Sequence, residues 1–426
     1  MSTEQQGVTR RQALGSGAAA VSALAMGPRP VNPTVRVGLV GCGGRGTGAV
    51  GSILQGREDV ELTAMGDLFQ SQIDERLGAL REYKTRDKQP LKGINVKPEN
   101  CFTGYEAYKR VIDSDIDVVL LVTPPYARPE HFEYAVKAGK NIFVEKPCAT
   151  DAAGINRMMA LEDEINRKGL NVVAGFERRH LPFMKECRQR LQDGAIGEMT
   201  TGYAYFNTNS IWYREPKPGM SDKDFWFYNW YHVDWMSGDH IVEQAVHSPD
   251  IINWIFDEVP VRAYGMGGRQ YHTERGGNIY DHFAVEYEYP DGTRMTSMCR
   301  QIVDTDTRIG EFIVGDKGTV TMLGGHDVNI TGPNAAVLEE YPEQNESHMQ
   351  EHRDFITDLR KGKIANDTRI LCEGSMTAIL GREAAYTGKV ITWDDMMKSN
   401  MKLTPDDIAK WDGSLRPVPK PGMKRG

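Results

Sequence analysis

The sequence contains few cysteines and no surplus of basic residues, and each absence excludes a class of protein. Its 6 cysteines among 426 residues are scattered and form no Cys-x-x-Cys pair. Neither a disulfide framework nor a cysteine-based zinc site is therefore expected, and we predict free thiols. The formal net charge is −8, whereas a nucleic-acid-binding protein needs a basic face. We therefore expect no nucleic-acid partner.

What is present is sufficient for a large folded protein. Hydrophobic residues make up 40% of the chain and aromatic residues 9%, which allows sizeable apolar cores. A chain of 426 residues corresponds to about two or three domains.

The first 25 residues have the features of an export signal. Thr9-Arg10-Arg11-Gln12-Ala13-Leu14 has the twin-arginine pattern, and the apolar run over residues 13–25 is too short to span a bilayer. Ala23-Leu24-Ala25 supplies small residues for cleavage. We therefore expect export by the twin-arginine machinery to the periplasm or beyond, without stable insertion in the membrane. A disordered N-terminus with a chance arginine pair is the alternative.

Residues 35–46 have the pattern of a buried strand followed by a glycine turn, and residues 47–55 can continue as a helix. This order suits the binding of a dinucleotide pyrophosphate. Gly41 would make the tight turn, Gly43 would let the backbone approach the phosphates, and Gly46 would allow close packing of helix on strand. The helix N-terminus would then supply N–H groups and the positive end of its dipole.

A second strand-like run, residues 60–67, ends at Asp67, which lies 21 residues beyond Gly46. A carboxylate at this place bonds the ribose hydroxyls of the adenosine half. The 2′-phosphate of NADP would meet this carboxylate, and Leu68 beside it is apolar. NAD is therefore favoured, although NADP is not excluded.

Strand and helix signals alternate through residues 31–150, which predicts a doubly wound parallel sheet. Ligands bind such sheets at the carboxyl ends of the strands. Two loops fall there, Thr123-Pro124 and Glu145-Lys146-Pro147. The predicted helices cover residues 70–82, 105–113 and 130–138, the predicted strands cover 118–122 and 141–145, and residues 83–101 are predicted as a polar loop.

The glycine turn, Asp67, Thr123-Pro124, Ala138-Gly139-Lys140 and Glu145-Lys146-Pro147 together resemble the Gfo/Idh/MocA oxidoreductase family, which includes glucose–fructose oxidoreductase and inositol dehydrogenase. These motifs cover roughly residues 35–260. Many members carry a histidine where Arg128 stands here. The resemblance implies that the cofactor is contacted by Gly41, Gly43, Gly44, Arg45, Gly46, Asp67, Thr123, Pro124, Glu145 and Lys146.

The resemblance also implies a domain organisation. We expect a signal peptide over residues 1–25, an NAD(P)-binding Rossmann domain over 31–150, and a substrate and oligomerisation domain over 151–395. A strand at 171–176 would join the two halves, and residues 396–426 would form a tail, loosely held from Arg416 onwards. The second domain would carry a mostly antiparallel open sheet, through whose exposed face relatives form dimers or tetramers.

The hairpins predicted for this second sheet pair residues 281–289 with 293–301 and residues 311–314 with 319–322. Helices are expected around 351–361 and 375–387.

Three residues are candidates for the chemistry, and the family implies their roles. Lys146 would lie beside the nicotinamide and stabilise the developing alkoxide. Glu243 and His247 are four residues apart and would project from one helical face. His247 would accept the hydroxyl proton while Glu243 orients it, although many members carry aspartate in place of Glu243.

Other interpretations of this segment remain open. His247 could be a core histidine satisfied by a backbone carbonyl. A metal site from His240, Glu243 and His247 is geometrically possible, but it lacks the His-Glu-x-x-His pattern and further ligands. No metal is therefore assigned. For Lys146, the alternative is an ordinary surface lysine in a loop.

Residues 203–235 contain 12 aromatic side chains within 33 positions. Their flat apolar faces suit stacking on sugar rings at the mouth of a pocket. Burial of this segment against the sheet or against a second subunit explains the composition equally well.

These observations predict an exported oxidoreductase that moves hydride between a carbohydrate hydroxyl, in a sugar, polyol or glycoside, and NAD. Twin-arginine substrates cross folded, and free NAD is scarce outside the cytoplasm, so the cofactor is expected to be tightly bound. One alternative is a glycoside hydrolase that uses bound NAD for transient oxidation and elimination. Another is a non-catalytic sensor that binds a sugar or nucleotide.

Overall fold

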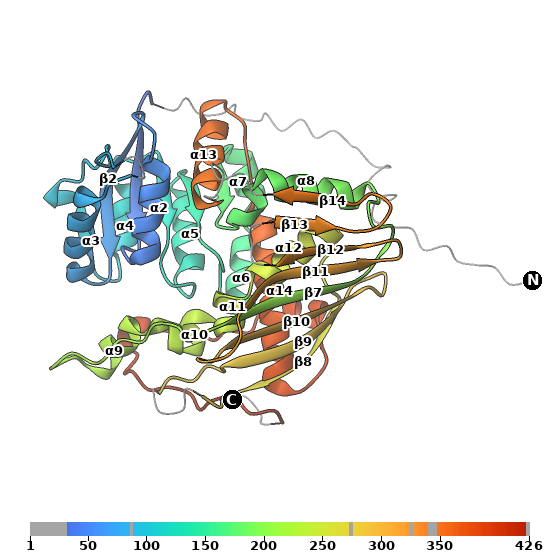
Figure 1. The fold of residues 1–426 in the computed structure, drawn as a ribbon. Helices are drawn as coiled ribbons and strands as arrows, with labels where there is room; N and C mark the ends of the chain where they lie inside the picture. The colour runs from blue at the N-terminus through green and yellow to red at the C-terminus, as the bar shows by residue number, and fades with distance from the viewer. Residues whose placement is uncertain (1–31, 86–87, 272–275, 324–326, 340–346, 423–426) are drawn as a thin grey trace, which may run out of the picture.

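The computed structural model describes residues 32–85, 88–271, 276–323, 327–339 and 347–422. The predicted export signal lies outside these residues. The described chain forms two sheets with helices around them, and Figure 1 shows the first sheet beside the broader second one. Within the described ranges, no helix combines the length and apolar character needed to cross a bilayer.

The first sheet has six parallel strands in the order β3-β2-β1-β4-β5-β6. Its central strands are apolar on both faces because helices cover both sides of a parallel sheet. The order reverses between β1 and β4, and this reversal opens a crevice at the strand ends. The elements are β1 (Val35–Val40), α2 (Gly44–Leu54), β2 (Val60–Asp67), α3 (Gln70–Glu82), η1 (Pro98–Asn100), β3 (Cys101–Thr103), α4 (Ala107–Asp113), β4 (Val118–Leu121), α5 (Arg128–Lys137), β5 (Asn141–Val144), α6 (Ala152–Met159), α7 (Glu162–Lys168) and β6 (Val172–Ala174).

The predicted doubly wound fold is confirmed, with two differences in detail. Residues 83–101, predicted as a loop, end in the edge strand β3, which at three residues is too short for a periodic signal. β6 also belongs to this sheet, so the first domain extends beyond residue 150, where the sequence places its end.

The second sheet has nine strands in the order β14-β13-β12-β11-β7-β10-β9-β8-β15. All neighbours are antiparallel except β7 and β10, which confirms the predicted mostly antiparallel sheet and both hairpins. Its strands are β7 (Met199–Thr208), β8 (Arg262–Gly268), β9 (His282–Glu288), β10 (Arg294–Gln301), β11 (Arg308–Gly315), β12 (Thr319–Leu323), β13 (Asp327–Ile330), β14 (Ala336–Glu339) and β15 (Ile391–Thr392).

Helices cover one face of this sheet. The longest, α14 (Thr368–Thr387), is buried along most of its length and packs on β8 and β9. With it lie η2 (Glu177–His180), α8 (Pro182–Gln192), α11 (His240–Glu243), α12 (His247–Phe256) and α15 (Trp393–Ser399).

Helix α13 (Ser347–Arg360) comes from the C-terminal part of the chain but docks on the first domain (Figure 1). Its Phe355, Ile356 and Leu359 share an apolar core with residues of β1 and α2. α13 also contacts η2 of the second domain. It therefore connects the first domain with the helices that cover the second sheet.

The aromatic segment and the C-terminal tail form a third, smaller unit beside the strand ends of the first sheet. It contains α9 (Asp222–Tyr228), η3 (Trp230–His232), α10 (Asp234–Ser237) and η5 (Ile408–Lys410). Phe227, Trp235 and Leu403 pack together in its core with Trp411 against them.

The prediction of a loosely held tail is wrong as far as residue 422. Arg416 bonds the carboxylate of Asp234 at 3.1 and 3.2 Å, and the Tyr280 hydroxyl donates to the Pro419 carbonyl at 2.9 Å. The tail is proline-rich, but these long-range contacts hold it. All six cysteines are free, as predicted.

Candidate active site

The glycine turn joins β1 to α2 in the geometry that the sequence predicts. Gly41 has φ +97°, and a Cβ there would lie 2.6 Å from the Val122 backbone. A Cβ on Gly46 would lie 2.0 Å from the Gly41 oxygen, so close packing requires glycine. A Cβ on Gly43 or Gly44 would meet nothing within 4 Å. The turn therefore leaves an open space in front of the α2 N-terminus, which suits a phosphate group.

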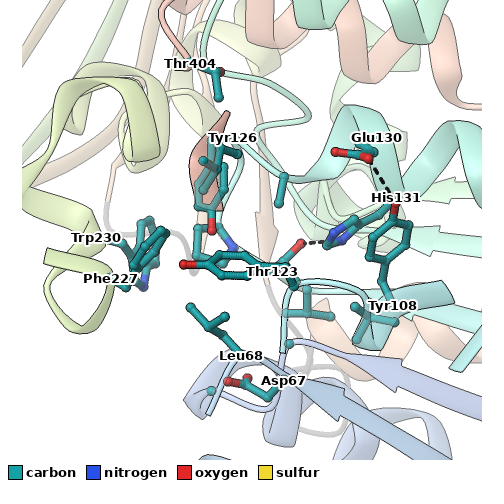
Figure 2. Close-up of a pocket in the computed structure, with 18 of the residues that line it drawn as sticks. Asp67, Leu68, Tyr108, Thr123, Tyr126, Glu130, His131, Phe227, Trp230 and Thr404 are labelled. Carbon is teal, nitrogen blue, oxygen red and sulfur yellow. Dashed lines mark hydrogen bonds between the residues drawn. The ribbon is translucent and has the colours of Figure 1, made fainter. Parts of the chain in front are cut away.

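Asp67 stands at the end of β2, beside this turn. Its two carboxylate oxygens accept hydrogen bonds from the backbone N–H groups of Cys42 at 2.7 Å and Phe69 at 3.0 Å. Burial raises the pKa of Asp67 above its ordinary value. Asp67 thereby fixes the turn to β2 and, with Leu68, faces the cavity described next (Figure 2).

A cavity of about 890 Å³ runs along the carboxyl ends of the first sheet. The glycine turn with Arg45 and Asp67 lines one part, and Thr123, Pro124 and Glu243 line another. Its further walls come from aromatic side chains and from the tail: Tyr126, Trp212, Phe227, Tyr228, Trp230, Tyr231, Thr404, Pro405 and Ile408. Volume, open glycines and a carboxylate at the β2 end all fit a dinucleotide.

The aromatic segment is divided between two environments, the cavity wall and the small core that it forms with the tail. Trp212, Trp230 and Tyr228 face the cavity, whereas Trp235 packs into the small core with Leu403. Phe227 belongs to both environments.

His131 on α5 lines the cavity, although the sequence did not single it out. Its Nδ1 lies 3.3 Å from the Thr123 hydroxyl, and its ring stacks on Tyr108 at 4.0 Å (Figure 2). Burial, followed by the charge of Arg128, lowers the pKa of His131 to about 3. This imidazole is therefore neutral, and it fixes the Thr123 side chain at the cavity wall.

Arg128, where many family members carry a histidine, is buried beneath the Glu145-Lys146-Pro147 loop. Its guanidinium donates to the Pro147 carbonyl oxygen, and burial lowers its pKa to about 10. It supports this loop from within the protein.

Lys146 and Glu243 meet at the inner end of the cavity. The Lys146 ammonium donates to the backbone oxygen of Glu243 and lies 3.4 Å from its carboxylate. The Lys146 side chain is only 11% exposed, so it is not the surface lysine of the alternative interpretation. Glu243 lines the cavity and Lys146 stands behind it.

Glu243 and His247 do not project from one helix, and this prediction is wrong. α11 ends at Glu243, a turn follows, and α12 starts at His247. Pro249 explains the break, because it has no N–H for the carbonyl four residues earlier and its ring clashes there. The three residues His240, Glu243 and His247 are not gathered as metal ligands in the described part of the chain.

His247 faces Glu177 instead, with Nδ1 3.5 Å from a carboxylate oxygen. Burial, followed by the charges of Lys146 and Arg178, lowers the pKa of His247 well below its ordinary value. Burial and the charge of Glu145 raise the pKa of Glu177 to about 7. A neutral imidazole has one ring nitrogen free to accept a hydrogen bond or a proton, and the same burial and positive charges that lower the pKa of His247 favour rapid loss of such a proton.

Arg45 connects the glycine turn to the catalytic candidates. It bonds the Glu145 carboxylate and, at 3.2 Å, the Glu351 carboxylate of α13. Burial alone would raise the pKa of Glu145, because it disfavours the charged carboxylate. The positive charges of Arg45 and Lys146 outweigh burial and lower this pKa to about 2.

Sequence reasoning missed Glu177, His348 and Glu351, which lie around this network. Glu177 stands in a run of charged residues, and the helix predicted from Glu351 begins four residues earlier, at Ser347. His348 and Glu351 are one helical turn apart, and that spacing was the available signal.

Comparison with known proteins accounts for this arrangement. Residues 35–173 match a model described as "Oxidoreductase family, NAD-binding Rossmann fold", and residues 184–321 match the "GFO/IDH/MocA C-terminal domain". Inositol 2-dehydrogenase/D-chiro-inositol 3-dehydrogenase of Lactiplantibacillus plantarum is 25% identical over 77% of this chain and 84% of its own length. Inositol 2-dehydrogenase of Rhizobium meliloti is 24% identical over 77% of this chain and 90% of its own.

Among solved structures, scyllo-inositol dehydrogenase from Lactobacillus casei with bound NAD(H) and scyllo-inositol superposes with a TM-score of 0.63 at 18% identity, covering 84% of this chain and 99% of that one. This likeness is evidence for the fold. The two family models together match well over half of the chain, and the chain therefore belongs to the Gfo/Idh/MocA family of NAD-binding oxidoreductases.

Proposed function

We propose that this oxidoreductase acts on a ring hydroxyl of a cyclic polyol or sugar and keeps its NAD bound through the catalytic cycle. The observation that carries the proposal is one continuous cavity, which joins the glycine turn and Asp67 to Glu243, the residue that Lys146 contacts from behind. Relatives named as inositol dehydrogenases support a polyol as the substrate class.

The cofactor, when bound, accepts hydride from the carbon that bears the reacting hydroxyl. The residues around the inner end of the cavity handle the proton and the charge on oxygen. The Lys146 ammonium donates a hydrogen bond to the oxygen as negative charge develops on it. His247, neutral because of its lowered pKa, takes the hydroxyl proton. Glu243 holds Lys146 and presents its own carboxylate to the substrate.

NAD is favoured over NADP in this proposal. Asp67 already faces the cavity with both oxygens fixed by backbone amides, so a 2′-phosphate would meet a preorganised negative charge. Tight binding is supported by the wall of the cavity, to which aromatic side chains and tail residues both contribute.

The first experiment measures the nucleotide content of the purified protein without added cofactor. We expect that denaturation releases close to one NAD(H) per chain and that myo-inositol, scyllo-inositol or a hexose reduces the bound NAD. A protein that holds no nucleotide and binds no added NAD would overturn the proposal. Release of an aglycone from a chromogenic glycoside, without net oxidation, would instead identify the hydrolase alternative.

The non-catalytic alternative is separated from the proposal by two substitutions. If the protein were a sensor, Lys146→Ala and His247→Ala would leave ligand affinity and biological output unchanged. We expect both to abolish most of the reduction of bound NAD.

Export through the twin-arginine machinery belongs to the proposal, supported by residues 9–25 of the sequence. Replacement of Arg10 and Arg11 by lysine is expected to retain the protein in the cytoplasm, as measured by cell fractionation. Equal export of this variant and the natural chain would overturn it.

We also propose a homo-oligomer that associates through the uncovered face of the second sheet. Large apolar side chains on β8 and β10 are exposed there: Tyr264, Met266 and Met298. Exposed apolar side chains gathered on one face of a sheet are typical of an interface. Light scattering would measure a dimer or tetramer, and a monomer at assay concentration would contradict this.

A further inference from the structure

A group of ligand-type side chains lies beside the proposed active site and is not used by it. Glu177 of η2 and His348 and Glu351 of α13 each offer one nitrogen or oxygen atom, and these atoms lie within 4.8 Å of one another. Two separate elements therefore bring an imidazole and two carboxylates together. A third carboxylate, that of Glu145, is connected to the group through Arg45.

The two carboxylates are buried and incompletely satisfied. Glu177 is 8% exposed and Glu351 is fully buried. The Oε2 atoms of both make no hydrogen bond to any residue that the structure describes. A buried carboxylate oxygen without a partner is costly, and in native proteins such an atom marks a bound water, a proton or an ion.

The nearby cations do not neutralise the group. Arg45 divides its guanidinium between Glu145 and the other oxygen of Glu351, and the Lys146 ammonium is bonded to Glu243. The Glu177 carboxylate lies 3.5 Å from the His247 imidazole, and no lysine or arginine of the described residues forms an ion pair with it. Among lysines and arginines of these residues, Glu351 has only the shared Arg45.

The geometry points to a binding site for one divalent transition-metal cation between Glu177, His348 and Glu351. Each of the three residues supplies one ligand atom, and the unpartnered Oε2 atoms add ligand capacity to the two carboxylates. His348 is 47% exposed and so provides a route from solvent to the buried carboxylates. This inference goes beyond the proposed function and makes no use of NAD or of a polyol.

The ligand set indicates which cations fit. A mixed imidazole and carboxylate set suits Zn²⁺ and Mn²⁺, whereas Mg²⁺ and Ca²⁺ prefer oxygen ligands alone. No thiol belongs to the site, and five of the six cysteines are buried. We therefore use Zn²⁺ and Mn²⁺ as probes and Mg²⁺ as the comparison cation.

The experiment titrates the untagged full-length protein, freed of metal by a chelator, with ZnCl₂, MnCl₂ and MgCl₂ in a calorimeter. We expect one Zn²⁺ or Mn²⁺ per chain, with Mg²⁺ bound much more weakly, and a higher Tm in the presence of the bound cation. Absence of Zn²⁺ and Mn²⁺ binding would overturn the inference and leave protons or water on the two carboxylates.

Variants then locate the binding. Glu351→Gln keeps the size of the side chain, and His348→Ala changes a half-exposed position where folding is not at risk. Each is expected to weaken binding by more than about tenfold, the smallest loss typical even of outer-shell changes, and to remove the increase in Tm.

Asp358→Asn is the matched control, because Asp358 lies on the same helix but pairs with Lys363 at 2.8 Å. It is expected to bind the cation as the natural protein does. Equal affinity in the natural protein, Glu351→Gln and His348→Ala would place the cation elsewhere and overturn the site.

Discussion

Lys146 is held in place by its surroundings more firmly than its sequence position suggests. Its ammonium contacts both the backbone and the carboxylate of Glu243, and Arg128 bonds the loop that carries it. This support fixes a positive charge at one point beside the cavity, and a fixed charge is what stabilises a developing alkoxide without reorganisation.

Replacement of Lys146 by alanine is therefore expected to lower kcat by roughly a hundredfold or more, with little change in NAD content. Steady-state kinetics together with the assay of released nucleotide would measure both quantities. Lys137→Ala, at an exposed lysine paired with Glu133, is the control and should retain activity. A Lys146→Ala enzyme with natural kcat would remove Lys146 from the mechanism.

Two glycines of the same turn are expected to differ sharply when replaced by alanine. Gly46→Ala places a Cβ 2.0 Å from the Gly41 oxygen, so we expect a loss of about 1–3 kcal/mol in the free energy of unfolding. Gly43→Ala has nothing within 4 Å, so it should leave stability unchanged while weakening NAD binding. Denaturant unfolding and NAD titration test the pair, and similar behaviour of both variants would contradict the assigned roles.

At the level of elements, the C-terminal tail and the aromatic segment act together as the cover of the cavity. Leu403 of the tail packs in one apolar core with Phe227 and Trp235 of the aromatic segment. The neighbouring Thr404 faces the cavity (Figure 2). Packing of the tail therefore also shapes one wall of the cofactor site.

Leu403→Ala is expected to cost about 2–3 kcal/mol in local stability, the lower part of the range for buried leucines, because Leu403 is 8% exposed. We expect faster release of bound NAD, measured by transfer of the nucleotide to an excess of a second NAD-binding protein. Val390→Ala, at a side chain that is 57% exposed, should release NAD at the natural rate. An unchanged release rate in Leu403→Ala would show that the tail does not retain the cofactor.

At the level of the whole molecule, α13 makes the two domains depend on each other. Its apolar side packs in the core of the first domain, while Glu351 and His348 on the same helix face η2 and Arg45. A change in how the domains meet must therefore alter the network around Lys146.

Phe355→Ala is the test of this dependence. Phe355 is 1% exposed, and its truncation is expected to cost about 3–5 kcal/mol. If α13 joins the domains, fluorescence and far-UV circular dichroism will report one shared transition at lower denaturant concentration. Two separated transitions in the natural protein would show that the domains unfold independently.

Several site residues could be predicted because their signals are local in the chain. The glycine turn follows a buried strand, Asp67 ends the next strand, and the Glu145-Lys146 loop follows a third; each depends on a few neighbouring residues. The parallel sheet follows from the same alternation, since apolar runs separated by helices have few other ways to pack.

The break between Glu243 and His247 has a signal in the sequence. Pro249 marks it, whereas the four-residue spacing of a carboxylate and a histidine predicts one helical face. The propensity of proline outweighs that spacing, because a missing backbone hydrogen bond and a steric clash act together.

The sequence by itself therefore determined the two-sheet architecture and the glycine turn between β1 and α2, because short-range patterns dictate strands, turns and helices. Tertiary structure decided which side chains meet. Arg45 bonds Glu351 across 306 positions of sequence, His247 lies 3.5 Å from Glu177, and tail residues line the cavity. Contacts of this kind depend on how whole elements pack, and the local periodicity of the sequence does not predict them.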